Sequence, residues 1–366
     1  MFKNSYQGKK VLVTGNTGFK GAWLTVWLLQ IGARVIGVSK DIPTQPSIFS
    51  ELLLAEKITY YQEDLRNLDR ISAIVADEAP DFVFHLAAQP IVSVSYSDPI
   101  ETISSNAMGT ANLLEALRLS NHPCVAVIIT SDKAYDNVEQ VWGYKEDDKL
   151  GGKDVYSGSK GAAELIIKSY FHSFFRRDES KIRLAIGRAG NVIGGGDWAT
   201  DRIVVDCMQA WNKGCQVEIR SPKATRPWQH VLEPLSGYLQ LGAELEVNSL
   251  LNGEAFNFGP RAEQNHSVET LLLDLSKYWD FADPSEAYTI TDSIPFHEAG
   301  LLKLNCDKAL FFLKWKACLD YHETVEYTSC WYYAFYRDHA DMLVLTQEQI
   351  SSYESLAQKR GLRWTE

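Results

Sequence analysis

The sequence places a tyrosine and a lysine four residues apart, Tyr156 and Lys160 in the motif YSGSK. On a helix this spacing puts both side chains on one face. A phenol has a pKa of about 10, so its use as a base near neutral pH requires stabilisation by about 4 kcal/mol, which nearby positive charge could supply. Because Y-x-x-x-K also occurs by chance in many helices, the pair alone indicates only a candidate site of proton transfer.

A second candidate motif, TSDKAY, contains Ser131, Asp132 and Lys133 and closes a strand ahead of that helix. Open parallel sheets bind their ligands at the carboxyl ends of their strands. An acid and an amine at that edge are candidates for proton transfer, whereas an ordinary exposed pair would contribute little. Ser131 could hydrogen-bond the oxygen whose proton Tyr156 removes.

Three glycines, Gly15, Gly18 and Gly21, stand in TGNTGFKG between the first expected strand and the first expected helix. Gly15 permits a tight turn, Gly18 lets the backbone approach a pyrophosphate, and Gly21 lets the helix pack closely on the strand. The helix N-terminus adds amides and a positive dipole end. A tight turn needs glycine without a ligand too, but this placement favours a bound dinucleotide, whose oxidised nicotinamide would help to ionise Tyr156.

Other cofactor contacts are expected where the next strands end. The second strand ends at Ser39 without an acid, so NAD and NADP both remain open. Asp64 is placed to reach adenine, although it equally suits a turn or a helix cap. Small side chains after the fourth strand leave room for a cofactor, or simply pack. With Tyr156 and Lys160, the predicted cofactor-binding residues are Gly15, Thr17, Gly18, Phe19, Gly21, Ser39, Asp64, Leu65, Leu86, Ala87 and Ala88.

Strands and helices alternate through the first half of the chain. The apolar runs predict strands at Val11 to Thr14, Arg34 to Val38, Ile58 to Tyr61, Phe82 to Leu86, Val125 to Thr130 and Ile182 to Ile186. Helices are expected at Ala22 to Gln30, Thr102 to Leu119 and roughly Ser159 to Phe175. This alternation predicts an α/β fold with a Rossmann-type, doubly wound parallel sheet that is covered on both faces.

The pattern changes beyond Arg188, where glycines at 194 to 196, prolines and aromatic helices follow. We predict a dinucleotide-binding Rossmann domain over residues 1–188, with a return at about 228–260. A smaller, mostly helical substrate lobe would comprise 189–227 and 261–366. We expect the aromatic helix at 330–335 to be core and the charged stretch 145–153 to be a solvated loop.

Composition limits the classes of function. The 366 residues carry a net charge of −11, which argues against general nucleic-acid binding, since that requires a basic face. The longest apolar runs fall short of the roughly 20 residues that cross a bilayer, and the polar start does not resemble a secretion signal, so we expect a cytoplasmic protein without membrane contact. Six widely spaced cysteines predict free, buried thiols and neither disulfides nor a metal site.

Together, the glycine loop, the Y-x-x-x-K pair and the second lobe resemble the extended short-chain dehydrogenases/reductases that act on nucleotide sugars. Within that family, TSDKAY, RAGNVIGGGDW from Arg188 to Trp198 and RPWQHV from Arg226 to Val231 are similar to the CDP-glucose 4,6-dehydratase group. The resemblance covers about the first 320 residues. The related dTDP-glucose dehydratases carry an Asp-Glu pair where this chain has Asp132 and Lys133.

The resemblance implies NAD as cofactor and CDP-glucose as substrate, with NADP not excluded. Tyr156 would take the proton of the sugar 4-hydroxyl while hydride passes from C4 to the nicotinamide. Lys133 would then remove the C5 hydrogen as Asp132 protonates the departing 6-hydroxyl, and the hydride would return to C6. Lys160 would hold the nicotinamide ribose. Desolvation favours neutral Asp132 and Lys133 while their attraction favours the charged forms, so direct action and a water relay both remain open.

The substrate diphosphate must find positive charge locally, and arginine side chains match phosphate oxygens. By resemblance, Asn191 would donate to the phosphates and His230 would lie near the nucleotide, although His230 could equally be a core histidine and each arginine a structural one. Trp228 is expected to pack. The predicted substrate-binding residues are Asn191, Arg202, Arg220, Arg226 and His230.

Two alternatives stay open. A nucleotide-sugar 4-epimerase of the same fold needs Tyr156 and Lys160 but no acid and base for C5 and C6, so Asp132 and Lys133 disfavour it. A non-catalytic dinucleotide-binding module would need none of these side chains. The family also implies a homo-oligomer, a dimer or tetramer, built on an intersubunit bundle of the helices expected at 102–119 and 159–175.

Overall fold

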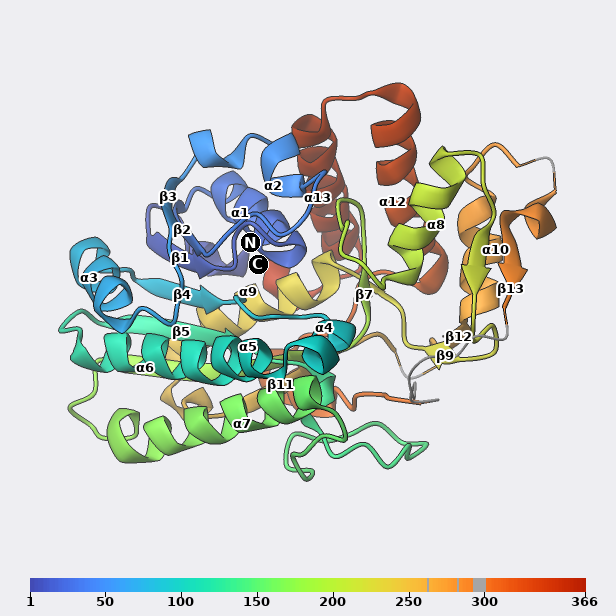
Figure 1. Cartoon of the computed structure of the whole chain (residues 1–366). Coiled ribbons are helices and arrows are strands. Elements are labelled where there is room, and N and C mark those ends of the chain that lie inside the picture. Colours follow the sequence, from blue (N-terminus) through green and yellow to red (C-terminus); the bar gives the residue numbers. More distant parts are fainter. Residues whose placement is uncertain (262, 282, 292–300) are drawn as a thin grey trace.

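A seven-stranded, all-parallel sheet forms the centre of the computed structural model, which describes residues 1–261, 263–281, 283–291 and 301–366 (Figure 1). The strand order is β11-β6-β5-β4-β1-β2-β3. The order reverses between β1 and β4, and ligands of such sheets bind outside the carboxyl ends at this reversal. The α/β, Rossmann-type prediction is confirmed. The strands are β1 Lys10–Thr14, β2 Arg34–Ser39, β3 Thr59–Gln62, β4 Phe82–His85, β5 Cys124–Ile129, β6 Ile182–Ala189 and β11 Ala255–Phe258.

Both faces of the sheet are covered because successive strand residues point to opposite sides. In β1, Val11 and Val13 join one core cluster and Leu12 joins the other. The first cluster contains side chains of α1 Phe19–Gln30, α9 Leu232–Val247 and α13 Met342–Lys359. The second contains those of α3 Leu68–Glu78, α6 Gly109–Leu119 and α7 Val155–Tyr170, which run together in Figure 1. Alternating apolar residues therefore fix a three-layer sandwich.

Two of the expected helices differ in their bounds. The helix expected at 102–119 is divided into α5 Pro99–Ile103, a π-helical turn η3 Ser104–Met108, and α6. The helix expected at 159–175 begins earlier, at Val155, because Asp154 caps it by accepting a hydrogen bond from the Ser157 amide at 2.8 Å. Tyr156 consequently lies in the first turn of α7.

The second lobe holds α8 Ile203–Asn212, α10 Val268–Ser276 and α12 Tyr321–Tyr333. Three short strand pairs accompany them. They are β7 Val192–Ile193 with β10 Gln229–His230, β8 Val217–Ile219 with β13 Tyr288–Ile290, and β9 Thr225–Arg226 with β12 His266–Ser267. The remaining short helices are α2 Ile48–Glu51, α4 Val92–Ser97 and α11 Asp307–Leu313.

Two C-terminal helices pack against the Rossmann sheet or its helices, and one of them, α13, also contacts α12 of the second lobe. α13 packs against α1, and the Trp27 indole donates to Glu354 across this contact at 2.8 Å. α11 packs against β11, the seventh strand, which lies within the predicted return at 228–260. The chain end therefore supports the helix that begins at the glycine loop.

The glycines at 194–196 are a point of close packing. A Cβ atom at Gly195 would lie 2.0 Å from the Trp331 ring, and the Trp23 indole donates to the Gly195 carbonyl at 2.9 Å. Because Gly195 has no side chain, the loop packs closely between Trp23 of α1 and Trp331 of α12. Trp331 is fully buried, as expected for the aromatic helix.

Two expectations about side chains need correction. The charged stretch 145–153 is not only a solvated loop, since the Glu146 carboxylate accepts from the Asn257 amide at 2.8 Å. All six cysteines are free, but Cys215, which follows α8, and Cys330, on an outward face of α12, are exposed, and Cys306 is half-buried beside the Gly259 carbonyl. Among the described residues, no helix has the length and apolar character to cross a bilayer.

Candidate active site

The YSGSK pair lies inside the protein at the carboxyl edge of the sheet. Tyr156 and Lys160 are 8% and 7% exposed and stand one turn apart on α7. Asp154, which caps this helix, also accepts from the Ser157 hydroxyl at 2.7 Å. The cap fixes the first turn, and with it the direction of the phenol.

The TSDK motif closes β5 and faces that helix. The Ser131 hydroxyl accepts from the Lys133 amide at 3.2 Å, so it caps the short helix η4 Asp132–Ala134. It also donates to Asp132 Oδ1 at 2.9 Å. Asp132 is 5% exposed, which excludes the ordinary exposed pair that the sequence left open. The structure thus brings Ser131, Asp132, Tyr156 and Lys160 to one place.

Burial sets the acid–base character of these groups. It raises the pKa of Asp132, against the charge of Lys133 and the Ser131 hydrogen bond, which lower it. It also raises the pKa of Tyr156, whereas the positive charge of Arg202 and the hydrogen bond with Ser131 lower it. Burial therefore keeps the Tyr156 phenol neutral near neutral pH and shifts Asp132 toward its protonated form.

Lys160 is surrounded by other charges. Burial and the positive charge of Lys20 together lower its pKa to about 8, while the charge of Glu164 acts in the opposite direction. Lys20, in the first turn of α1, has a pKa lowered to about 8 by burial and by Arg202, while Asp132 raises it. The sequence reasoning missed Lys20, although this residue stands inside the quoted glycine motif. Its interactions place it beside the catalytic groups.

A buried ion pair holds the catalytic elements together. Glu164, one turn beyond Lys160, accepts from the Thr130 hydroxyl and from Arg188 Nε, both at 2.7 Å. A second Arg188 nitrogen also pairs with this carboxylate, and both side chains are fully buried. Arg188 donates further to the Tyr135 hydroxyl at 2.5 Å. The pair therefore locks α7 to the ends of β5 and β6.

The glycine loop has the shape that a dinucleotide pyrophosphate requires. Gly15 has φ of +74°, and a Cβ atom there would lie 2.7 Å from the Ala87 nitrogen. A Cβ atom at Gly21 would lie 2.1 Å from the Gly15 carbonyl oxygen. At Gly18, the N-cap of α1, the nearest atom is 3.4 Å away, so space remains beside the helix amides. These residues fit a dinucleotide.

The other predicted cofactor residues follow this loop around the sheet edge. The Thr17 amide donates to the Ser39 hydroxyl at 3.3 Å, and Phe19 begins α1 beside Gly194. Leu86, Ala87 and Ala88 are half-buried after β4, whereas Leu65 is nearly buried against Gly109. Their contacts with a cofactor stay predictions.

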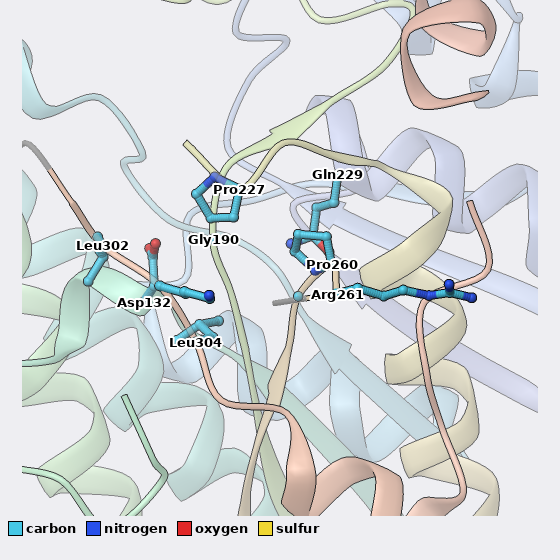
Figure 2. A pocket seen from close by; sticks show the side chains of 10 residues that line it. Asp132, Gly190, Pro227, Gln229, Pro260, Arg261, Leu302 and Leu304 are labelled. Atoms are coloured by element: carbon cyan, nitrogen blue, oxygen red, sulfur yellow. The ribbon is translucent and has the colours of Figure 1, made fainter. Parts of the chain in front are cut away.

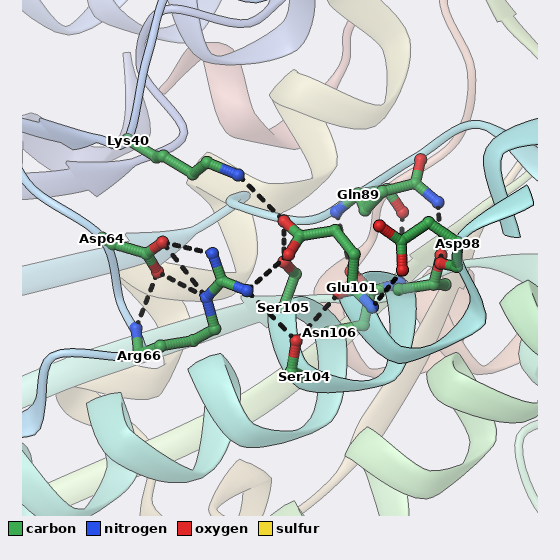
Figure 3. Close-up of polar contacts among 10 residues, drawn as sticks. Lys40, Asp64, Arg66, Gln89, Asp98, Glu101, Ser104, Ser105 and Asn106 are labelled. Atoms are coloured by element: carbon green, nitrogen blue, oxygen red, sulfur yellow. Dashed lines mark hydrogen bonds and ion pairs between the residues drawn. The ribbon is translucent and has the colours of Figure 1, made fainter.

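Asp64 does not stand free to meet adenine. Its carboxylate is gripped by Arg66, with the Arg66 NH2 nitrogen at 2.6 Å and Nε at 3.0 Å (Figure 3). The Arg66 hydrogen bond lowers the pKa of Asp64. Sequence reasoning missed Arg66 because an acid and an arginine two residues apart carry no signal of pairing.

The Asp132 carboxylate borders a pocket between the two parts of the chain (Figure 2). A Cβ atom at Gly190 would lie 2.9 Å from Asp132 Oδ2, so a side chain there would push this carboxylate out of its position. Two cations that the sequence did not single out, Arg261 and Lys303, also line the pocket. Its other lining residues are Pro227, Gln229, Gly259, Pro260, Leu302 and Leu304.

The predicted substrate residues lie in several places. Arg202 precedes α8 and acts on Tyr156 and Lys20 by its charge, so it lies near the catalytic centre; its Nε atom is buried without a hydrogen-bond partner among the described residues. Arg220 is exposed beyond β8, and Arg226 is half-buried in β9. Asn191 precedes β7, and its carbonyl accepts from the Gln229 amide at 3.3 Å.

His230 lies in the core. It is fully buried between the Trp23 and Tyr327 rings, both edge-on, and burial lowers its pKa to about 3. The structure therefore favours the core histidine over the nucleotide contact. Trp228 likewise packs, with its indole donating to the His266 carbonyl at 3.1 Å.

The dinucleotide loop and the buried Tyr156–Lys160 pair at one edge of a parallel sheet place the chain in the class of extended short-chain dehydrogenases/reductases. Its family within that class follows from sequence. The model of the GDP-mannose 4,6 dehydratase family matches residues 12–328, and the chain belongs to this family.

Known relatives agree with this placement. The chain is 44% identical over 356 residues to the CDP-glucose 4,6-dehydratase of Salmonella typhimurium, which covers 96% of this chain and 98% of that protein. It is 26% identical to a CDP-paratose 2-epimerase of Salmonella typhi over 74% of this chain and 84% of that protein.

Solved structures share the fold. A dTDP-glucose 4,6-dehydratase from Streptomyces venezuelae with NAD bound superposes with a TM-score of 0.75 at 18% identity, over 91% of this chain and 99% of that one. A UDP-glucuronic acid 4-epimerase from Bacillus cereus superposes with a TM-score of 0.76 at 23% identity, over 89% of this chain and 99% of that one.

Proposed function

We propose that this chain is an NAD-dependent nucleotide-sugar dehydratase that converts CDP-glucose to CDP-4-keto-6-deoxyglucose. The observation that carries the proposal is the buried Asp132 carboxyl beside Lys133, at the edge where Tyr156 and Lys160 lie. Loss of water across C5 and C6 needs an acid and a base there. The full-length similarity to a CDP-glucose 4,6-dehydratase supports the same reaction.

NAD fits the glycine loop and, when bound, supplies the acceptor and later the donor of one hydride. Tyr156 takes the proton of the sugar 4-hydroxyl, and Ser131 holds that oxygen through a hydrogen bond. Lys160 contributes positive charge that favours the phenolate, as does Arg202.

Elimination uses the other pair. The 4-ketone acidifies the C5 hydrogen, which Lys133 removes, while Asp132 gives its proton to the departing 6-hydroxyl. Burial raises the pKa of Asp132, which supports its role as the acid. To complete the reaction, Lys133 would return its proton to C5 as a hydride is added at C6, and Tyr156 would lose to solvent the proton that it took while Asp132 regains one.

The diphosphate of the substrate requires positive charge near the pocket. We assign this role to Arg202 first, because its unpaired Nε atom lies by the catalytic groups. Arg220, Arg226 and Asn191 remain candidates farther along the second lobe. We also assign dinucleotide binding to residues 1–188 with about 228–260, and the nucleotide-sugar side to 189–227 with 261–366.

We further propose a cytoplasmic homodimer. Exposed apolar side chains gather on α5, η3 and α7, with Ile100 72%, Met108 52% and Leu165 57% exposed. Such a helical face is typical of an interface. Sedimentation should give twice the chain mass, and Leu165→Glu should shift it to the monomer.

The experiment that tests the function is incubation with a panel of nucleoside-diphosphate glucoses and mass spectrometry of the products. Loss of one water from the cytidine compound alone supports the proposal. An unchanged mass with inverted stereochemistry at C4 would instead indicate an epimerase, which Asp132 and Lys133 disfavour.

A further inference from the structure

Four charged side chains form a network near the ends of β2 and β3, which we call the Lys40–Glu101 cluster: Lys40, Asp64, Arg66 and Glu101 (Figure 3). Glu101, on α5, accepts from Lys40 Nζ at 2.9 Å and from an Arg66 nitrogen at 2.5 Å. A terminal nitrogen of Arg66 also donates to Asp64 Oδ2 at 2.6 Å. Glu101 therefore links the two cations.

The cluster lies where the adenosine half of a dinucleotide is expected. The glycine loop is tied to the end of β2, because the Thr17 hydroxyl donates to the Asp41 carbonyl at 2.7 Å and its amide donates to Ser39 at 3.3 Å. In Rossmann folds the residue at the end of the second strand meets the adenosine ribose. Ser39 ends β2 and Lys40 follows it, so Lys40 is expected near the ribose that carries the 2′ position.

The charges of the cluster cancel. Two cations face two carboxylates, and the Ser105 hydroxyl holds Glu101 in place at 3.1 Å. Hydrogen bonds from Lys40 and Arg66 lower the pKa of Glu101, so this carboxylate is ionised at neutral pH. NADP differs from NAD by a 2′-phosphate dianion. The cluster has no excess positive charge to bind this phosphate, and its Glu101 carboxylate would repel it.

We propose that Glu101 makes this chain prefer NAD to NADP. Glu101 neutralises Lys40 and Arg66, the two cations that could otherwise bind a 2′-phosphate. The inference rests on the proposed function only in that a nicotinamide dinucleotide binds at the glycine loop. It does not depend on the sugar substrate or on turnover.

The test is isothermal titration of the full chain with NAD and with NADP, without sugar. Wild type is expected to bind NAD more tightly. Glu101→Gln should tighten NADP binding about tenfold while leaving NAD nearly unchanged. Adding Lys40→Ala to that variant should remove the gain, and higher salt should shrink it. Glu115→Gln, which breaks a comparable exposed pair with Arg118 on α6, is the matched control and should leave the preference unchanged.

Glu101 is partly exposed, so the variants should fold, and Glu101→Ala provides a second substitution without the carboxylate. Equal affinity of wild type for NAD and NADP would overturn the inference, and so would a preference that both Glu101 variants leave intact. Failure of either dinucleotide to bind would instead overturn the proposed function itself, and the inference with it.

Discussion

Two groups of charged residues at the same sheet edge behave in opposite ways. In the catalytic centre, burial raises the pKa of Asp132 and lowers that of Lys160 to about 8, so both move toward their neutral forms. In the Lys40–Glu101 cluster, hydrogen-bonded partners lower the pKa of Glu101 and raise that of Lys40, so both keep their charges. Burial shifts pKa values at the catalytic centre, whereas pairing of partly exposed groups produces fixed charges suited to recognition.

The largest effect is expected at the phenol. Tyr156→Phe keeps the buried ring but removes the group that takes the 4-hydroxyl proton, so turnover should fall about 10⁴-fold. Formation of the 4-keto product measures it. Tyr170→Phe, at the far end of α7, is the control and should keep wild-type turnover. An active Tyr156→Phe enzyme would remove the phenol from the mechanism.

A separation of the two half-reactions comes next. Lys133→Ala should spare oxidation at C4 but slow loss of water about 10³-fold, because the C5 base is missing. Reduced nicotinamide should therefore accumulate, visible by its absorbance in a single turnover. Lys149→Ala, at an exposed lysine paired with Asp136, should show no accumulation. If Lys133→Ala turned over without a pause, another group would have to be the base.

The buried ion pair sharpens the contrast between burial and exposure. Glu164→Gln leaves the Arg188 charge buried without its partner, so the free energy of unfolding should fall by about 4 kcal/mol. Asp136→Asn breaks the exposed pair with Lys149 and should leave the free energy of unfolding almost unchanged. Denaturant unfolding measures both. Equal losses would mean that burial does not distinguish these pairs.

Lys160 predicts a pH-dependent stability. Its pKa is about 8 in the folded protein and 10.5 in the unfolded chain. Below pH 8 the buried charge therefore lowers the free energy of unfolding by about 3 kcal/mol. Between pH 8 and 10.5 Lys160 is protonated in the unfolded chain but neutral in the folded protein, so stability rises with pH and the cost disappears. Lys160→Met should therefore stabilise the nucleotide-free protein at pH 7, and the gain should vanish near pH 10.5. A gain independent of pH, or none at pH 7, would contradict the shifted pKa.

The features that the sequence predicted correctly depend on residues close together along the chain. The glycine spacing in TGNTGFKG and the four-residue step from Tyr156 to Lys160 depend on neighbours along the chain, and alternating runs such as Val11 to Val13 fixed the layers of the sheet. The TSDK motif could be placed at the sheet edge because it follows a strand.

The features that the sequence left undecided depend on contacts between distant segments. Nothing near His230 along the chain indicates that Trp23 and Tyr327 enclose it. Glu101 meets Lys40 across 61 residues, and Arg261 reaches the Asp132 pocket from beyond β11. These side chains acquire their roles only when the fold brings their elements together.

The central claim is that one hydride leaves C4, waits on the cofactor and returns to C6 of the same sugar. CDP-glucose carrying deuterium at C4 tests it directly, by mass spectrometry and NMR of the product. The account predicts a 4-keto-6-deoxy sugar that has lost water and carries the deuterium in its C6 methyl group. Deuterium lost to solvent, or retained at C4 in a product of unchanged mass, would contradict it.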